Sequence, residues 1–136
     1  MKTFALKTEH KKILADTITP VSVYLKLRDV FPHSLLLESS DYNANNNDFS
    51  YICCNPIASI ELKNNILTTH FPDKSLEVEK VNSMLDIPER IHKFSQQFES
   101  ERFPFKFISN GIFGYVAHDA VDSFENIELN KTKPGQ

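Results

Sequence analysis

The sequence predicts an α+β domain, with a mostly antiparallel sheet and two main helices packed on it. Strand-like runs are numerous and are separated by short turns. Only two stretches, within 20–31 and 87–98, repeat apolar residues at helical spacing. Strands and helices do not alternate along the chain as they do in parallel βαβ proteins, and no internal repeat is visible.

The composition is that of one globular domain. The chain has 136 residues, of which 40% are hydrophobic and 24% charged. A net charge of −3 offers no basic surface for phosphates, so nucleic acid is not an expected partner. The apolar runs are too short to cross a bilayer, and early lysines interrupt any signal peptide. We therefore expect a cytoplasmic protein without membrane contact.

The N-terminal third predicts two extended pieces and a helix. Phe4 and Leu6 alternate within a strand over 3–8, and 13–15 is a second short extended piece. Thr19 is the expected N-cap of a helix with Pro20 at its first position. That helix should end at 31–32, because a proline disfavours the helical region for the residue before it.

The middle of the chain predicts a series of strands. Three consecutive leucines in 34–39 indicate a central strand that is buried on both faces. The asparagine-rich segment 41–48 is an expected loop. Asn64 and Asn65 suit a two-residue hairpin turn, because asparagine tolerates positive φ. The remaining strands are expected over 49–54, 57–62 and 66–71.

The second predicted helix begins near Asp86, which should cap it. Its apolar stripe consists of Ile87, Ile91, Phe94 and Phe98. Phenylalanines alternate over 103–107 as an edge strand or an extended lead-in. After them we expect a turn at 109–111, a strand over 112–117 and a short helix from Asp119 to Phe124. The polar tail 130–136 is a linker or the boundary of the segment.

Known catalytic and cofactor motifs are absent from the sequence. It has no nucleophile elbow, P-loop, dinucleotide fingerprint or zinc pattern. The adjacent Cys53 and Cys54 do not suit a mutual disulfide or a metal site. His118 and Asp119 would project to opposite faces of a strand, so packing and capping roles are favoured over a catalytic relay. We therefore expect no catalytic residue, metal or cofactor in this chain.

Two other features admit both structural and functional interpretations. Glycines at 111 and 114 are typical of a strand that another element or a ligand approaches closely. Glu38 and Ser39 place a carboxylate and a hydroxyl at the end of the leucine strand. A buried carboxylate needs a cation, a donor or solvent, and a free amino acid supplies matching groups. The alternative is a strand that simply emerges into water.

Four motifs together resemble the N-terminal domain of anthranilate synthase component I, over about 16–125. They are Asp16-Thr17-Ile18-Thr19-Pro20-Val21, Leu36-Leu37-Glu38-Ser39, Ser50-Tyr51-Ile52 with Asn55-Pro56, and Gly111-Ile112-Phe113-Gly114-Tyr115 with Asp119. Three positions depart from the family pattern. Cys53 or Cys54 occupies the position of a family glycine, Asn110 replaces another glycine, and His118 replaces an aromatic residue.

The resemblance implies a regulatory role for residues 1–129. The intact family enzyme is a lyase that converts chorismate and ammonia to anthranilate, with magnesium in a C-terminal catalytic domain that this chain lacks. A glutamine amidotransferase subunit, component II, delivers the ammonia. Tryptophan binds away from the chemistry and inhibits the enzyme. By this resemblance its contacts are Ser39 first, then Glu38 and Leu37, with Pro20 or Val21 as weaker candidates, and the fragment alone should be inactive.

Two alternative functions stay open. The first is the homologous component of aminodeoxychorismate synthase in folate synthesis, whose N-terminal domain shares these motifs. The Thr19-Pro20-Val21 start and the Leu-Leu-Glu-Ser strand favour the tryptophan pathway. The second is a stand-alone binding or interaction module. A domain that normally packs on a catalytic partner should instead expose apolar surface, as the eleven phenylalanines suggest.

Overall fold

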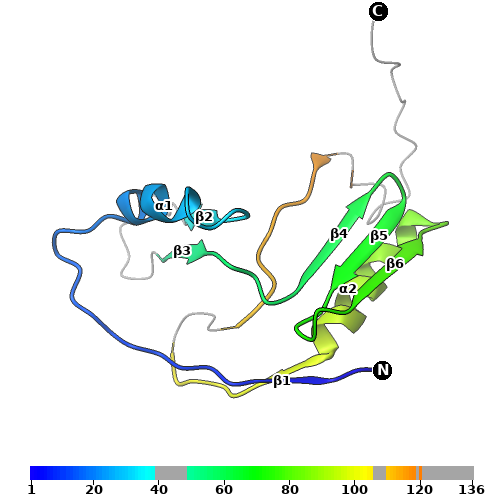
Figure 1. Cartoon of the computed structure of the whole chain (residues 1–136), viewed down its shortest axis with the longest axis horizontal. Helices are drawn as coiled ribbons and strands as arrows, with labels where there is room; N and C mark the ends of the chain where they lie inside the picture. The colour runs from blue at the N-terminus through cyan, green and yellow to red at the C-terminus, as the bar shows by residue number, and fades with distance from the viewer. Residues whose placement is uncertain (39–48, 106–109, 119, 121–136) are drawn as a thin grey trace, which may run out of the picture. The chain divides into compact units, whose positions relative to one another are not determined.

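The computed structural model describes residues 1–38, 49–105, 110–118 and 120, and it has the predicted α+β architecture (Figure 1). The chain divides into two compact units. The first includes Met1–Phe4 and Ala58–Glu99, and the second includes Ala5–Ile57 and Ser100–Gly114. The short strands β1 (Phe4–Leu6) and β7 (Phe98–Ser100) pair with each other.

The first unit is built on a three-stranded antiparallel sheet. Its strands are β4 (Ser59–Lys63), β5 (Ile66–His70) and β6 (Leu76–Lys80), in that order. Asn64 and Asn65 have φ values of 52° and 61°, which confirms the predicted hairpin turn. Strand β6 was not predicted from the sequence.

Helix α2 (Ile87–Gln96) follows a 3₁₀ turn over Met84–Asp86 and lies against this sheet. It begins where the sequence predicts. The expected cap is wrong, because Asp86 has helical dihedral angles and its side chain makes no capping hydrogen bond. The helix also ends before Phe98, which starts β7 instead of completing the apolar stripe.

The apolar core of the first unit joins α2 to the sheet. Leu67, Val81 and Ile87 are at most 6% exposed, and Ile60, Leu62, Met84 and Ile91 pack around them. An aromatic cluster extends this core toward the N-terminus. It consists of Phe4, Phe71, Phe94 and Phe98, with ring centroids 5.1–6.2 Å apart.

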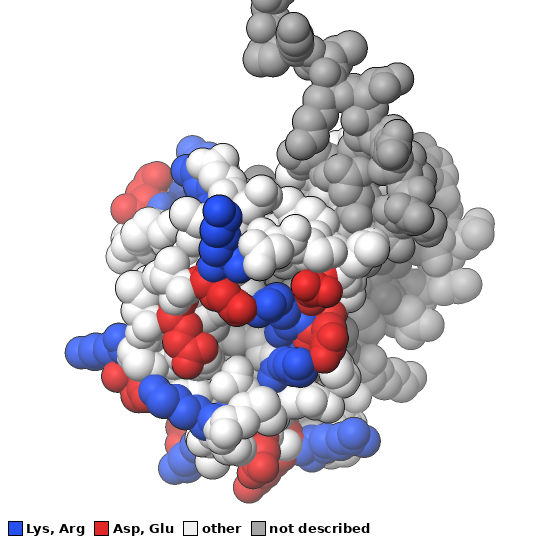
Figure 2. All heavy atoms as spheres, turned by 90° about the vertical axis from the view of Figure 1, so that its right-hand side faces the viewer, with Lys and Arg blue, Asp and Glu red and all other residues white. Residues whose placement is uncertain are grey.

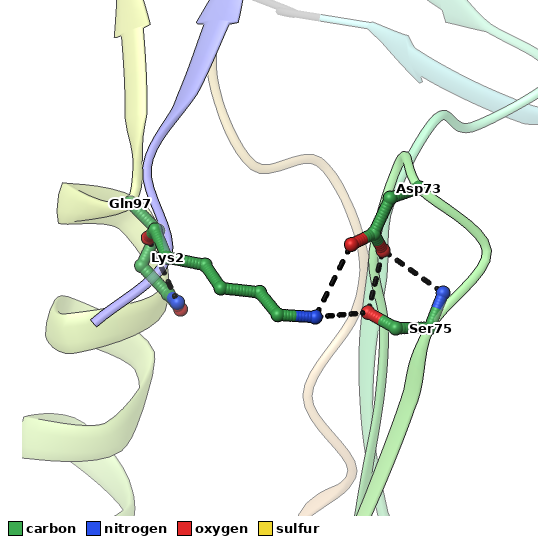
Figure 3. Close-up of polar contacts among 4 residues, drawn as sticks. All are labelled: Lys2, Asp73, Ser75 and Gln97. Carbon is green, nitrogen blue, oxygen red and sulfur yellow. Dashed lines mark hydrogen bonds and ion pairs between the residues drawn. The ribbon is translucent and has the colours of Figure 1, made fainter.

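Polar contacts hold the N-terminal residues on this cluster (Figure 3). The Lys2 ammonium lies 3.0 Å from the Ser75 hydroxyl and 5.8 Å from the centre of the Phe71 ring. The Gln97 side-chain amide donates to the Lys2 carbonyl at 3.2 Å. The N-terminal strand is therefore attached both to the β5–β6 turn and to the end of α2.

The second unit contains α1 (Pro20–Arg28), β2 (Leu35–Glu38) and β3 (Ser50–Cys53). The predicted cap of α1 is confirmed: the Thr19 hydroxyl accepts from the Ser22 backbone N–H, and the Ser22 hydroxyl accepts from the Thr19 N–H, both at 3.2 Å. Strands β2 and β3 pair antiparallel, and α1 packs against both.

Several predictions for the second unit are wrong. No strand forms at 13–15, where Ile13 and Leu14 are exposed. Helix α1 ends at Arg28, earlier than expected, because the N–H groups of Val30 and Phe31 both turn back to the Leu27 carbonyl. The leucines of β2 are half-buried, not fully buried, and within the described ranges β2 pairs with β3 alone.

The predicted strand over 112–117 is also wrong, because these residues lie outside any strand. Of the two alternatives for 103–107, the edge strand does not form at residues 103 and 105, and the extended lead-in that Pro104 favours is left. A strand needs a partner for its backbone hydrogen bonds, and no described strand pairs with either segment. The predicted loop at 41–48, Phe107, the helix from Asp119 and the tail 130–136 lie outside the described residues.

Candidate functional site

Two of the candidate contacts, Leu37 and Glu38, lie at the end of β2. Leu37 is half-buried and stands opposite Tyr51 of β3, and Glu38 stands opposite Ser50. Glu38 is exposed, and its carboxylate has no hydrogen-bond or ion-pair partner among the described residues. An exposed carboxylate keeps its hydration, so Glu38 needs no protein partner. Ser39, the first candidate, lies outside the described residues.

Pro20 and Val21 form the first turn of α1, and both are exposed. Because α1 packs on β2 and β3, these residues belong to the same compact unit as Leu37 and Glu38. No described hydrogen bond or ion pair joins the two groups. The structure thus places four of the five candidates on neighbouring elements without forming a closed site between them.

An aromatic contact brings two of the sequence motifs together. The Tyr51 ring lies 5.6 Å from the Phe113 ring, centroid to centroid. Tyr51 stands opposite Leu37 in the strand register, so Phe113 of the glycine motif reaches the strand pair that carries Leu37 and Glu38. Gly114 has no atom within 4 Å of the position that a Cβ would occupy. The close approach expected at this glycine is therefore not seen within the described residues.

Sequence reasoning missed a polar contact beside this motif. The Asn110 side-chain amide donates to the Thr8 hydroxyl at 3.0 Å. Close by in the sequence, His10 makes edge contacts with Phe103 and Phe105 at 5.1 and 5.0 Å. Both interactions join segments about a hundred positions apart, and neither has a local sequence signal. Asn110 thus has a tertiary contact that its sequence neighbours do not predict.

The cysteines and histidines offer no catalytic constellation in the described ranges. Cys53 and Cys54 form no disulfide. The pKa of the Cys53 thiol is raised mainly by burial, and the neighbouring Cys54 contributes a smaller increase. A raised pKa disfavours the nucleophilic thiolate. His118 is exposed. No three metal-ligating side chains gather among the residues that the structure describes.

Burial differs sharply between the two units. Every described residue that is less than 9% exposed lies in the first unit: Leu67, Thr69, Phe71, Val81, Ile87 and Phe94. In the second unit, large apolar side chains such as Val21, Leu25 and Val30 are 44–68% exposed. The unit that carries the candidate contacts therefore has no closed core of its own in its described part. Across the described part of the chain, no helix combines the length and apolarity that a membrane span requires.

Two curated proteins are similar to this chain over most of its length. The chain is 31% identical to anthranilate synthase component 1 of Lactococcus lactis over 87% of its residues. It is 28% identical to anthranilate synthase component 1 of Aquifex aeolicus over 92% of its residues. The chain spans about a quarter of the length of these relatives, at 24% and 25%. No family model matches the chain, and no solved structure matches it.

Proposed function

We propose that this chain is the N-terminal regulatory part of an anthranilate synthase component 1. The observation that carries the proposal is the similarity to two such proteins along nearly the whole chain, at only a quarter of their length. The α+β fold and the antiparallel strand pairs agree with it. The intact protein would be a lyase that forms anthranilate from chorismate and ammonia, and this segment alone would be inactive.

The open second unit supports a role within a larger protein. Its leucine strand is half-buried, and several large apolar side chains of α1 and of the segments around it face solvent. These side chains are already about half buried, so covering the rest of each would stabilise it by roughly 1 kcal/mol, and a covering partner is favoured. We propose that the catalytic domain in the same polypeptide is that partner. It would hold the magnesium ion, and component II would supply ammonia.

The regulatory ligand in this proposal is L-tryptophan at the end of β2. Glu38 offers the ligand ammonium a carboxylate that pairs with no described residue, and Leu37 offers apolar surface for the indole. Ser39 would donate to the ligand carboxylate, with Pro20 or Val21 at the border of the site. Because α1 and β2 lie in one unit that lacks a core, closure by a second domain would complete the site. Tryptophan would then inhibit by its higher affinity for the closed arrangement.

The composition of the chain permits a direct binding test. The 136 residues contain no tryptophan, so in experiments on this chain the emission excited at the red edge of indole absorption reports added L-tryptophan alone. Binding to the chain would raise the fluorescence anisotropy of the ligand. Isothermal titration calorimetry with L-tryptophan measures the same binding to the intact protein, whose other residues can include tryptophan. The absence of binding to both proteins would remove the tryptophan-sensing role.

The reaction product separates the proposal from its nearest alternative. Anthranilate formation from chorismate by the intact protein supports the tryptophan pathway. Aminodeoxychorismate formation would instead assign the chain to the homologous folate enzyme. Formation of neither product, with a stable monomeric 136-residue chain, would favour a stand-alone binding module.

A further inference from the structure

Charges of neither sign dominate the face of the molecule that Figure 2 shows, where acidic and basic side chains lie next to each other. Opposite charges also pair within the first unit, as Arg90 does with Glu79 and Lys93 with Glu89. In the described part of this face, no patch of one sign therefore indicates a charged ligand. The chemistry that the structure points to lies in the second unit, at the polar contact between Thr8 and Asn110.

The Asn110 side-chain amide is held by the Thr8 hydroxyl at both of its polar atoms. Its Nδ2 donates to the hydroxyl oxygen at 3.0 Å, and the hydroxyl faces its Oδ1 at a longer distance of 3.4 Å. Both residues are half-buried and belong to the second compact unit. Asn110 is followed by Gly111, and this is the one Asn-Gly pair in the sequence. The contact therefore holds an amide whose neighbour along the chain is a glycine.

Gly111 leaves its backbone nitrogen available for reaction. The residue is exposed and lies outside any helix or strand, and its N–H donates no hydrogen bond to a described residue. Glycine has no Cβ, so the backbone here is free to bring this nitrogen against the carbonyl carbon of the preceding side chain. A nucleophile and an electrophile in adjacent residues react at a high effective concentration. Gly111 thus supplies the nucleophile for a reaction at the Cγ of Asn110.

We propose that Asn110 is a site of spontaneous deamidation whose rate is set by Thr8. The Gly111 nitrogen attacks the Asn110 Cγ and gives its proton to water, and the new N–Cγ bond closes a succinimide ring. The Cγ–Nδ2 bond breaks, and Nδ2 takes up a proton and leaves as ammonia. Water then adds to either ring carbonyl and opens the ring, which leaves aspartate or isoaspartate at position 110. Water is the only co-reactant, and the site does not depend on the proposed function.

Thr8 slows this reaction because its contact favours the unreacted amide. The shorter hydrogen bond uses the amide N–H as donor. Once Cγ becomes tetrahedral, Nδ2 loses the conjugation that makes it a good donor, so the contact stabilises the ground state more than the transition state. The product carboxylate accepts hydrogen bonds but cannot donate one, so the bond from Nδ2 to Thr8 is lost. Isoaspartate also lengthens the main chain by a CH₂ group directly before Gly111.

The test is incubation of the full 136-residue chain at neutral pH, followed by peptide mapping with mass spectrometry. Conversion also adds one negative charge, which ion-exchange chromatography of the whole chain detects. Asn82, which is exposed and precedes Ser83, is the internal control. We expect Asn110 to convert faster than Asn82, and Gly111→Ala to remove this difference, because a Cβ hinders the approach of the nitrogen. Conversion of Asn110 no faster than that of Asn82 in the wild type would overturn the proposal.

Two variants of Thr8 test its control of the rate. Thr8→Ala should speed conversion of Asn110 by about fivefold, as expected for the loss of one hydrogen bond, whereas Thr8→Ser keeps the hydroxyl and should keep the wild-type rate. In concentrated urea all three chains should react equally fast, because the contact exists only in the folded chain, and amide NMR spectra without urea report whether each variant folds. An unchanged rate in folded Thr8→Ala, or an equal increase in Thr8→Ser, would overturn the role of the hydroxyl.

Discussion

Lys2 and Asp73 form an ion pair, with the ammonium nitrogen 3.1 Å from a carboxylate oxygen, although the two residues are 71 positions apart. Asp73 also accepts hydrogen bonds from the hydroxyl and the backbone N–H of Ser75. The turn between β5 and β6 thus offers a preformed carboxylate to the N-terminal strand. This contact attaches residues 1–4 to a unit whose sheet begins only at Ser59.

The first prediction concerns the pH dependence of this contact. Hydrogen bonds from Ser75, and then the nearby Lys2 ammonium, lower the pKa of Asp73 from 3.8 to about 2. Because folding lowers this pKa, the stabilisation is present above pH 3.8 and is lost as the pH falls toward 2. Asp73→Asn keeps an acceptor for Ser75 but cannot titrate. Its melting temperature, followed by circular dichroism, should therefore fall less steeply over this pH range than that of the wild type.

Glu61→Gln serves as the control for this measurement, because it also removes one exposed carboxylate from the same sheet. The control should retain the acid slope of the wild type. An identical slope in Asp73→Asn and the wild type would mean that ionisation of Asp73, with its Ser75 and Lys2 contacts, adds nothing to folding stability.

The second prediction concerns the same turn. Lys74 has a φ of 66°, in the left-handed region, and its N–H donates to the Phe71 carbonyl at 2.9 Å. Glycine adopts this conformation without the steric cost of a Cβ. Lys74→Gly should therefore raise the free energy of unfolding by about 1 kcal/mol, measured by urea denaturation. Lys63→Gly, within β4, should lower it by about 0.5–1 kcal/mol. A lower free energy of unfolding in both variants would show that the left-handed conformation of Lys74 does not cost stability.

Local signals decide which parts of this fold can be predicted from sequence. The β4–β5 hairpin was predicted because Asn64 and Asn65 favour the required φ values. Helix α2 was predicted because its apolar stripe matches one buried face. Strand β6 was missed because its two apolar residues, Leu76 and Val78, face away from the core and give a weak pattern. A strand over 112–117 was predicted from composition alone, but its formation depends on a distant partner strand.

The sequence predicts which helix and strand carry the candidate residues, but it does not predict the contacts between these elements. Leu37 and Glu38 lie on a strand, and Pro20 begins a capped helix, as the sequence predicts. The contact between Tyr51 and Phe113 has no sequence signal, because it joins segments that are distant in the chain. The half-burial of β2 was also missed, since a run of leucines does not reveal whether its covering surface lies within the same segment.

The third prediction tests the cap of α1. Thr19 and Ser22 exchange two side-chain hydrogen bonds at the start of the helix. Thr19→Ala leaves a backbone N–H without its acceptor and should cost about 1 kcal/mol of unfolding free energy. The measurement is chemical denaturation of the 136-residue chain. Thr17→Ala, two residues before the cap, should have little effect, and equal losses in the two variants would contradict the capping role.

The fourth prediction concerns the aromatic cluster. Phe94 is 6% exposed, and its ring centroid lies 6.2 Å from that of Phe71 and 5.1 Å from that of Phe98. Phe94→Ala removes the central ring and should cost about 3–5 kcal/mol, which is a large share of the stability of a small domain. Val78→Ala, on the exposed face of β6, should cost less than about 0.5 kcal/mol. Comparable unfolding midpoints for the two variants would mean that the cluster does not stabilise the first unit.

The final prediction tests the tryptophan site under the proposed function. A phenylalanine at position 39 would fill the space that the ligand needs beside Leu37 and would remove the hydroxyl donor. Ser39→Phe in the intact enzyme should therefore abolish inhibition by tryptophan while anthranilate formation continues at a measurable rate. The inhibition curve is recorded from anthranilate fluorescence at increasing L-tryptophan.

Ser40→Phe places the same side chain one position along, so a general disturbance of the segment would affect both variants alike. Inhibition of unchanged potency in Ser39→Phe would remove Ser39 from the site, whereas selective loss in that variant would assign the end of β2 to the regulatory ligand.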